Sequence, residues 1–145
     1  MSDARTAWHG IPIDDDSSPV VRTYFADEDG WTRVRRAIES RGEFIAPVHF
    51  VDDRVFEGLE VSALMAMRAE TAESPTFILL ADQVAMSSDE HPLLVVDLFD
   101  EPGRCFRVIA SEIWSVTCNL PIANMDWEDF AEAVDKDGVF RGFGR

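Results

Sequence analysis

Acidic residues follow the predicted strands of this chain at the positions where a parallel sheet binds its ligands. Asp52 follows the second predicted strand, Asp82 follows the third, and His49 lies within the second. Because the carboxyl ends of parallel strands meet at one edge of a sheet, these three side chains could line an acidic pocket. Such a pocket would serve a small enzyme or a ligand-binding domain with its site at the C-terminal edge of the sheet.

The strand-end carboxylates could also hold Mg²⁺, as acidic residues do in the receiver domains of phosphate-transfer systems. Those domains also need a lysine at a strand end, whereas the single lysine of this chain, Lys136, follows the last predicted helix. Helix capping accounts for Asp27 and Asp29 without a metal, and an exposed loop accounts for Asp52 and Asp53. The three histidines form no metal-binding pair, so we predict no metal and no cofactor.

A cysteine–histidine pair for nucleophilic catalysis is formally available. Cys118 could pair with His49 or His91, but it lies near the C-terminal end of a predicted helix, where the dipole raises a thiol pKa. Cys105 and Cys118 also lack the spacing of a redox or zinc motif. We therefore expect two reduced, mostly buried thiols and assign no catalytic residue.

Net charge restricts the class of partner. The chain has 28 Asp and Glu residues against 13 Lys and Arg, which gives a formal charge of −15 at pH 7. Affinity for nucleic acid comes largely from Lys and Arg, so nucleic-acid binding is not expected. An excess of acid accelerates encounter with a positively charged surface. A basic protein partner is therefore one hypothesis, and the alternative is that the acidity only keeps the protein soluble.

The acidic residues are dense between residues 61 and 100, where Arg68 is the single basic residue. We predict that an interaction module of the immunity or adaptor type would bind its partner through carboxylates of this region. The predicted binding residues are Glu73, Asp89, Glu90, Asp97 and Asp100.

Length and composition predict one folded domain. The chain has 145 residues, of which 46% are hydrophobic and 28% charged, values typical of a globular domain with its own core. It contains no apolar run of the roughly 18 residues that a membrane span needs, and no signal-peptide pattern. We predict a cytoplasmic protein, monomeric or homodimeric, that does not bind membranes.

The domain is predicted to cover residues 19–145, preceded by a flexible acidic tail over residues 1–18. Residues 14–18 are acidic and polar without periodicity, and Pro19 follows them. Trp8 and residues 11–13 are apolar exceptions within the tail. The sequence leaves open whether these residues pack on the domain.

Hydrophobic periodicity predicts an α/β fold, with a mixed sheet of about five strands, an appended β-hairpin, and helices packed on the sheet. The predicted strands are 20–25, 44–51 with Pro47 marking an edge, 76–81, 92–99 and 104–110, the last two forming the hairpin around a Pro-Gly turn. Helices are predicted around residues 31–38, over 61–68, after a Ser111 cap, and over 126–135, and residues 139–143 return along the domain.

Two residues near the C-terminus are predicted to be structural anchors. Helical spacing predicts that Trp127, Phe130 and Val134 are buried. Arg141, between two phenylalanines, is predicted to have its guanidinium held by carboxylates and its stem packed on aromatic surface.

Two short segments, Ala123-Asn124-Met125-Asp126 and Phe140-Arg141-Gly142-Phe143, carry a family resemblance together with the predicted strand over residues 90–98. With them, residues 19–143 resemble a family of small acidic actinobacterial proteins of unknown function. The resemblance implies a bacterial cytosolic domain of the kind encoded beside toxin or secretion systems. It implies no catalytic residue.

Overall fold

A six-stranded mixed sheet forms the centre of the computed structural model, which describes residues 7–14, 16–39, 46–71, 73–122 and 125–143. The strand order is β4-β3-β5-β6-β7-β8. The strands are β3 (Ser18–Arg22), β4 (Val48–Val51), β5 (Phe77–Ala81), β6 (Pro92–Asp97), β7 (Cys105–Ile109) and β8 (Val139–Phe140). All neighbours are parallel except β5–β6 and β6–β7, so β6 alone runs against the others. The predicted single-domain α/β fold with a mixed sheet is confirmed.

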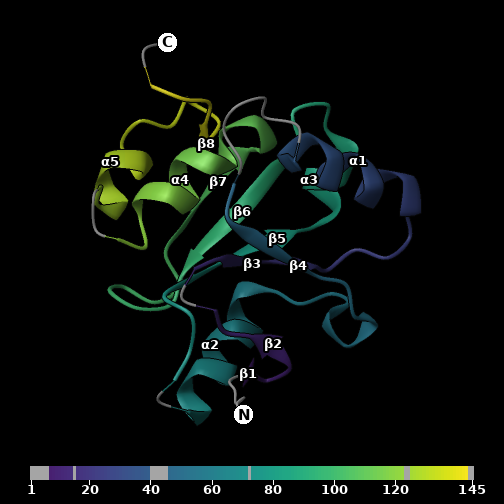
Figure 1. Cartoon of the computed structure of the whole chain (residues 1–145), viewed down its shortest axis with the longest axis vertical. Helices are drawn as coiled ribbons and strands as arrows, with labels where there is room; N and C mark the ends of the chain where they lie inside the picture. Colours follow the sequence, from purple (N-terminus) through teal and green to yellow (C-terminus); the bar gives the residue numbers. More distant parts are fainter. Residues whose placement is uncertain (1–6, 15, 40–45, 72, 123–124, 144–145) are drawn as a thin grey trace.

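Helices cover both faces of the sheet (Figure 1). One face carries α1 (Glu28–Glu39), α3 (Gln83–Ser87), α4 (Ile113–Asn119) and α5 (Trp127–Ala131). The other face carries α2 (Val61–Glu70) and a small antiparallel hairpin of β1 (Ala7–Trp8) and β2 (Ile11–Pro12). Two short 3₁₀ helices, η1 (Arg54–Phe56) and η2 (Ala110–Glu112), lie in the connections.

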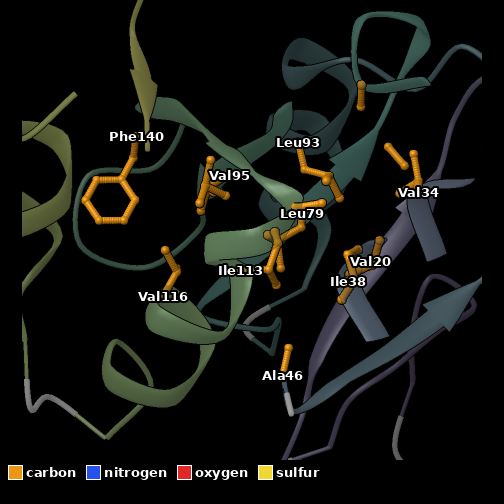
Figure 2. Packing of buried hydrophobic residues seen from close by; sticks show 14 of the residues in the cluster. Val20, Val34, Ile38, Ala46, Leu79, Leu93, Val95, Ile113, Val116 and Phe140 are labelled. Carbon is orange, nitrogen blue, oxygen red and sulfur yellow. The ribbon is translucent and has the colours of Figure 1, made fainter. Parts of the chain in front are cut away.

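The central strands are apolar throughout because both faces of the sheet are covered. Within β5, Leu79 belongs to the core beneath α1 and α4, and its neighbours Ile78 and Leu80 belong to the core beneath α2. Figure 2 shows the first of these cores, in which side chains of α1 and α4 pack on β3, β5 and β6. The labelled residues are Val20, Val34, Ile38, Ala46, Leu79, Leu93, Val95, Ile113, Val116 and Phe140.

The N-terminal hairpin packs against the second core. Trp8 and Ile11 are 1% and 0% exposed, so the apolar residues that the sequence left open are buried on the domain. His49 connects this segment to the edge strand β4, because its Nδ1 lies 2.6 Å from the Ser17 hydroxyl and its Nε2 lies 2.9 Å from the Pro12 carbonyl oxygen. The histidine thus fastens the segment that precedes β3.

Several element boundaries differ from the sequence-based predictions. The last helix was expected to reach residue 135, but α5 ends at Ala131 and Val134 is only half-buried. Ser111 was expected to cap the helix that follows it, but it lies within η2, which leads directly into α4. The strand predicted over residues 44–51 begins at Val48, while Phe44 lies outside the described residues. The structure also corrects the expected burial of both cysteines, which are exposed.

Candidate functional site

The carboxylates at the C-terminal ends of β4 and β5 are bound within the protein. Asp52 accepts a hydrogen bond from Arg22 at 3.2 Å. Asp82 accepts two from Arg107, at 3.1 and 2.8 Å, and also caps the first turn of α3. No hydrogen bond or ion pair joins His49, Asp52 and Asp82, all three of which the structure describes. The structure therefore gives each residue of the predicted pocket a different partner.

Arg22 neutralises much of the negative charge at this edge. Its side chain is 2% exposed, donates to Glu28 at 2.6 Å and to Asp52, and stacks on the Phe25 ring at 4.3 Å. Burial acts to lower the pKa of Arg22, but the two carboxylates outweigh it and hold the pKa above its usual value. In the described part of the chain, no group of three or more His, Cys, Asp or Glu side chains is placed to hold a metal ion.

The five predicted binding carboxylates lie at separate places. Glu73, Asp89 and Asp100 are exposed, whereas Asp97 is only 3% exposed. Glu90 precedes β6 and Asp97 ends it, so the strand holds these two residues roughly 20 Å apart. The five residues are therefore spread along the sheet, and the Asp97 carboxylate is buried and bonded within the protein.

Arg141 connects the C-terminal segment to the start of β6. Its guanidinium donates to Asp137, Glu90 and Asp135, with shortest distances of 2.7, 2.9 and 2.8 Å. Hydrogen bonds to Asp137, Glu90 and Asp135 hold the pKa of Arg141 above its usual value. This geometry suits a structural residue that is charged at every physiological pH.

A hollow of about 470 Å³ lies at the opposite end of the sheet, where β5 begins and β6 ends. We call it the first hollow. It is lined by Thr76, Phe77, Asp97, Phe99, Asp100, Arg104, Leu120, Pro121, Met125, Asp126, Trp127 and Glu128. These residues come from the start of β5, the end of β6 and the β6–β7 turn, the segment that joins α4 to α5, and the first turn of α5. In Figure 1 the β6–β7 turn projects from the left end of the molecule.

Arg104 organises the side of the first hollow formed by the turn. Its guanidinium donates to Asp97 at 2.7 Å, to Glu128 at 2.8 Å and to Glu101 at 3.1 Å. It also lies 4.9 Å from the centroid of the Trp127 ring, a cation–π geometry. Trp127 is 7% exposed. Arg104 therefore connects the β6–β7 turn to α5.

Asp97 shapes the turn itself. Its carboxylate accepts hydrogen bonds from the backbone N–H groups of Phe99, Asp100 and Glu101 at 2.9, 3.2 and 2.9 Å. Burial acts to raise the pKa of Asp97, but these N–H groups and Arg104 outweigh it and hold the pKa below its usual value. The turn is thus closed by a buried, charged carboxylate.

Exposed carboxylates surround the first hollow. We call them the acidic rim: Asp100, Asp126 and Glu128 line the hollow, and Glu101 lies beside it, bonded to the lining residue Arg104. The side chains of Asp100 and Glu101 are 72% and 70% exposed, and that of Glu128 is 53% exposed. Phe99 is 70% exposed beside them. The first hollow therefore combines an apolar floor, an exposed aromatic ring and a negatively charged border.

A second hollow of about 430 Å³ adjoins the first, and the two share Thr76, Phe77 and Pro121. Its other lining residues are Ile13, Asp14, Asp16, Ser17, Ser18, Pro19, Pro47, Ser74, Pro75, Thr117, Cys118 and Ile122. Asp14 and Asp16 are exposed, and Ile122 is 72% exposed. The second hollow therefore repeats the combination of acidic and apolar side chains.

The cysteine–histidine pairs that the sequence offered do not form. Cys118 lines the second hollow, but His49 is bonded to Ser17 and Pro12, and buried His91 lies 2.9 Å from the Ala85 carbonyl oxygen through Nδ1. Desolvation raises the pKa of the Cys118 thiol, which disfavours the thiolate that nucleophilic attack requires.

Sequence reasoning missed both hollows because their walls come from segments far apart along the chain. The rule for parallel sheets points to the C-terminal ends of the strands, whereas these hollows lie where β3 and β5 begin. One signal was present in the sequence. Met125 and Asp126, which line the first hollow, belong to the Ala-Asn-Met-Asp segment that the sequence singled out.

Comparison with family models identifies the family of the chain. Residues 17–143 match the model described as a domain of unknown function, DUF6924. The chain belongs to this family. The matched range contains the whole lining of the first hollow and most of that of the second. Comparison with curated proteins gives no significant match.

Within the described part of this DUF6924 domain, no helix is long and apolar enough to cross a bilayer.

Proposed function

We propose that this DUF6924 domain is a protein-interaction module, of the immunity or adaptor type, that binds a basic protein partner through its acidic surface. The observation that carries the proposal is the acidic rim around the apolar first hollow, with Phe99 exposed beside it. Aromatic side chains supply much of the binding energy at protein interfaces, and charge complementarity supplies orientation and speed of encounter.

The charges at the site favour a positively charged partner. Six acidic residues and one arginine line the two hollows among the residues that the structure describes. Arg104 contributes one positive charge against these six negative ones, so the lining remains negative overall. A basic partner would meet an attractive potential there, and an acidic partner would be repelled.

Exposed apolar side chains support a macromolecular partner. Phe99 and Ile122 are 70% and 72% exposed, and each lines one of the hollows. Burial of apolar surface on association is favourable by about 25 cal/mol per Å² before the costs of ordering are subtracted. A partner that covers both side chains gains this term in addition to the electrostatic attraction.

The setting of the proposed function is a bacterial cytoplasm. The composition and the family resemblance support this setting, with actinobacteria as the source. The five residues predicted from the sequence to bind a partner have different positions relative to the hollows. Asp100 keeps that role within the acidic rim, Asp97 positions the turn, and Glu73, Asp89 and Glu90 lie outside both hollows.

A ligand-binding domain is the second candidate, and the size of the hollows favours it. Volumes of about 470 and 430 Å³ fall in the range of small-molecule pockets, about 300–1,000 Å³. The site would then take a small cation. Competition with arginine amide distinguishes the two candidates, because a small-molecule site would bind it and a protein-binding surface would not hold it appreciably.

The proposal is tested by capture from a native bacterial lysate on three immobilised forms of the domain. The rim variant carries Asp100→Asn and Glu101→Gln. The control variant carries Asp29→Asn and Asp89→Asn, which remove the same charge from exposed positions outside the hollows. The wild type and the control variant should retain a stoichiometric basic protein that the rim variant loses. Equal capture by all three forms, or an acidic protein as the retained partner, would contradict the proposal.

A further inference from the structure

The two hollows adjoin and share the lining residues Thr76, Phe77 and Pro121, and we call the pair the groove. The groove runs along the end of the sheet where β3 and β5 begin. Carboxylates line both hollows, Asp14 and Asp16 the second, and Asp100, Asp126 and Glu128 the first.

Prolines restrict the backbone along the second hollow. Four of the seven prolines of the chain, Pro19, Pro47, Pro75 and Pro121, line the second hollow. A proline ring fixes its own backbone angle and carries no N–H group, so these residues present a stiff and largely apolar wall. A site that is already formed loses less conformational entropy on binding.

We infer that the groove binds one extended, basic segment of the partner, with apolar side chains on its floor and cationic side chains at its two acidic ends. This inference rests on the proposed function of binding a basic protein, and it specifies how the partner is recognised. An extended segment presents alternate side chains on the same side, about 7 Å apart. Adjoining hollows that share one wall suit two successive side chains of this kind.

Each end of the groove has an apolar contact beside its charges. In the first hollow, Phe99, Leu120 and Met125 lie with the acidic rim. In the second, Ile13 and Ile122 lie with Asp14 and Asp16. The segment therefore needs both apolar and basic residues on the side that faces the groove, and neither kind of residue is sufficient alone.

The two cysteines provide a direct readout of occupancy. Both thiols are exposed, and Cys118 lines the second hollow whereas Cys105 lines neither hollow. A segment that spans the groove covers Cys118 and leaves Cys105 accessible. A segment that binds only at the acidic rim covers neither thiol.

The experiment measures the reaction of each thiol with an uncharged maleimide, using Cys105→Ser and Cys118→Ser variants that retain one cysteine each. The probe is an acetylated peptide of about seven residues in which pairs of arginines alternate with pairs of leucines, so that each side of the extended chain carries both kinds over a length of roughly 23 Å. Two control peptides replace arginine by glutamate, or leucine by serine. With the groove about nine-tenths occupied, the Cys118 rate should fall about tenfold, while the Cys105 rate stays the same and both control peptides have no effect.

A pair of matched substitutions tests the apolar contact. Ile122→Ser removes an exposed side chain of the second hollow, and Val55→Ser removes one that is 74% exposed on η1, outside both hollows. Ile122→Ser should weaken peptide binding about fivefold or more, and Val55→Ser should leave it unchanged. Because both residues are exposed, neither substitution threatens the fold.

The outcomes separate this inference from the function on which it rests. The peptide could bind the wild type and lose affinity for the rim variant, yet leave Cys118 reactive and bind the Ile122→Ser variant as tightly as the wild type. That result would support a basic partner and would contradict binding of an extended segment along the groove. Equal protection of both cysteines would show coating of the acidic surface and would also overturn it. Absence of binding to all three forms of the domain would count against both.

Discussion

At the scale of single residues, the charged side chains near the groove fall into two groups. Asp97 and Arg104 are buried or nearly so and hold the β6–β7 turn against α5. The acidic rim is exposed, and its members Asp100, Glu101 and Glu128 are bonded to Arg104. The buried group sets the shape of the first hollow, and the exposed group sets its potential.

The Asp97→Asn substitution should destabilise the domain by on the order of 3 kcal/mol, because it removes a charged acceptor of several hydrogen bonds and leaves Arg104 partly unpaired. The folded-state pKa of Asp97 is depressed, so its contribution is complete above the unfolded value of about 4 and is lost as pH falls through the folded value. Urea denaturation at several pH values measures the difference between wild type and variant. That difference should be constant near neutrality and shrink below about pH 4, and a difference that grows on acidification would refute this role.

The Arg141→Lys substitution should lower the melting temperature without reducing binding of the arginine–leucine peptide. A lysine cannot bridge Glu90, Asp135 and Asp137 with the planar set of donors that arginine provides. Thermal unfolding and peptide titration on the same preparation measure both effects. An unmoved melting curve together with lost binding would show that Arg141 belongs to the binding site.

At the scale of elements, α5 is a short helix set by packing and capping. The Asp129 carboxylate accepts a hydrogen bond from the Asp126 N–H at 2.8 Å, which fixes the start of the helix. Trp127 packs edge-on against Phe106, with ring centroids 4.9 Å apart, and Phe130 is fully buried. The position of α5 determines where Trp127 and the Glu128 part of the rim lie.

The Trp127→Ala substitution should lower the free energy of unfolding by about 3–5 kcal/mol, the range for a buried aromatic side chain. Trp127→Phe should cost less because most of the apolar volume is kept. Chemical denaturation of both variants measures the two changes. A loss below about 1 kcal/mol for the alanine variant would mean that α5 is not held by this ring.

The elements with strong local patterns were predictable from the sequence. The apolar run of β5, the hairpin of β6 and β7, and the stripe of Trp31, Val34 and Ile38 in α1 each carry a clear period or turn signal. The end of α5 was not predictable in this way. The periodic pattern continues to Val134, but the chain turns after Ala131 and leads through Gly138 to the pairing of β8 with β7.

The candidate site was harder to predict than the fold because tertiary contacts decide it. The sequence placed acidic residues at the C-terminal ends of strands but could not show that Arg22 and Arg107 neutralise Asp52 and Asp82. The groove is assembled from segments that meet only in the folded chain. The sequence pattern likewise did not predict that the turn closed by Asp97 leaves Phe99 exposed.

At the scale of the whole molecule, the formal charge of −15 is distributed around a domain with two apolar cores. This net value already includes the 13 Lys and Arg residues, several of which are paired with carboxylates. The groove is a place where the negative potential coincides with exposed apolar side chains. This coincidence, more than the net charge, distinguishes a binding surface from an acidity that only keeps a protein soluble.

Association of a basic peptide with this surface should be strongly salt-dependent. Exposed charges attract an approaching partner less as the screening length falls to about 8 Å at physiological ionic strength. Stopped-flow measurement of the association rate at increasing salt should give a steep decline for the wild type and a shallower one for the rim variant. Parallel declines would mean that the total charge, and not the rim, attracts the partner.

Binding of a basic partner at the acidic rim is tested most directly by the equilibrium affinity of the arginine–leucine peptide at one fixed salt concentration. The affinity is measured for the wild type, for the rim variant Asp100→Asn/Glu101→Gln and for the control variant Asp29→Asn/Asp89→Asn. The two variants lose the same charge, so an effect of net charge alone would change them equally. The acidic groove predicts that the rim variant binds about tenfold more weakly than the wild type while the control variant binds as the wild type does, a difference of about 1.4 kcal/mol. Equal affinities of the two variants would contradict it.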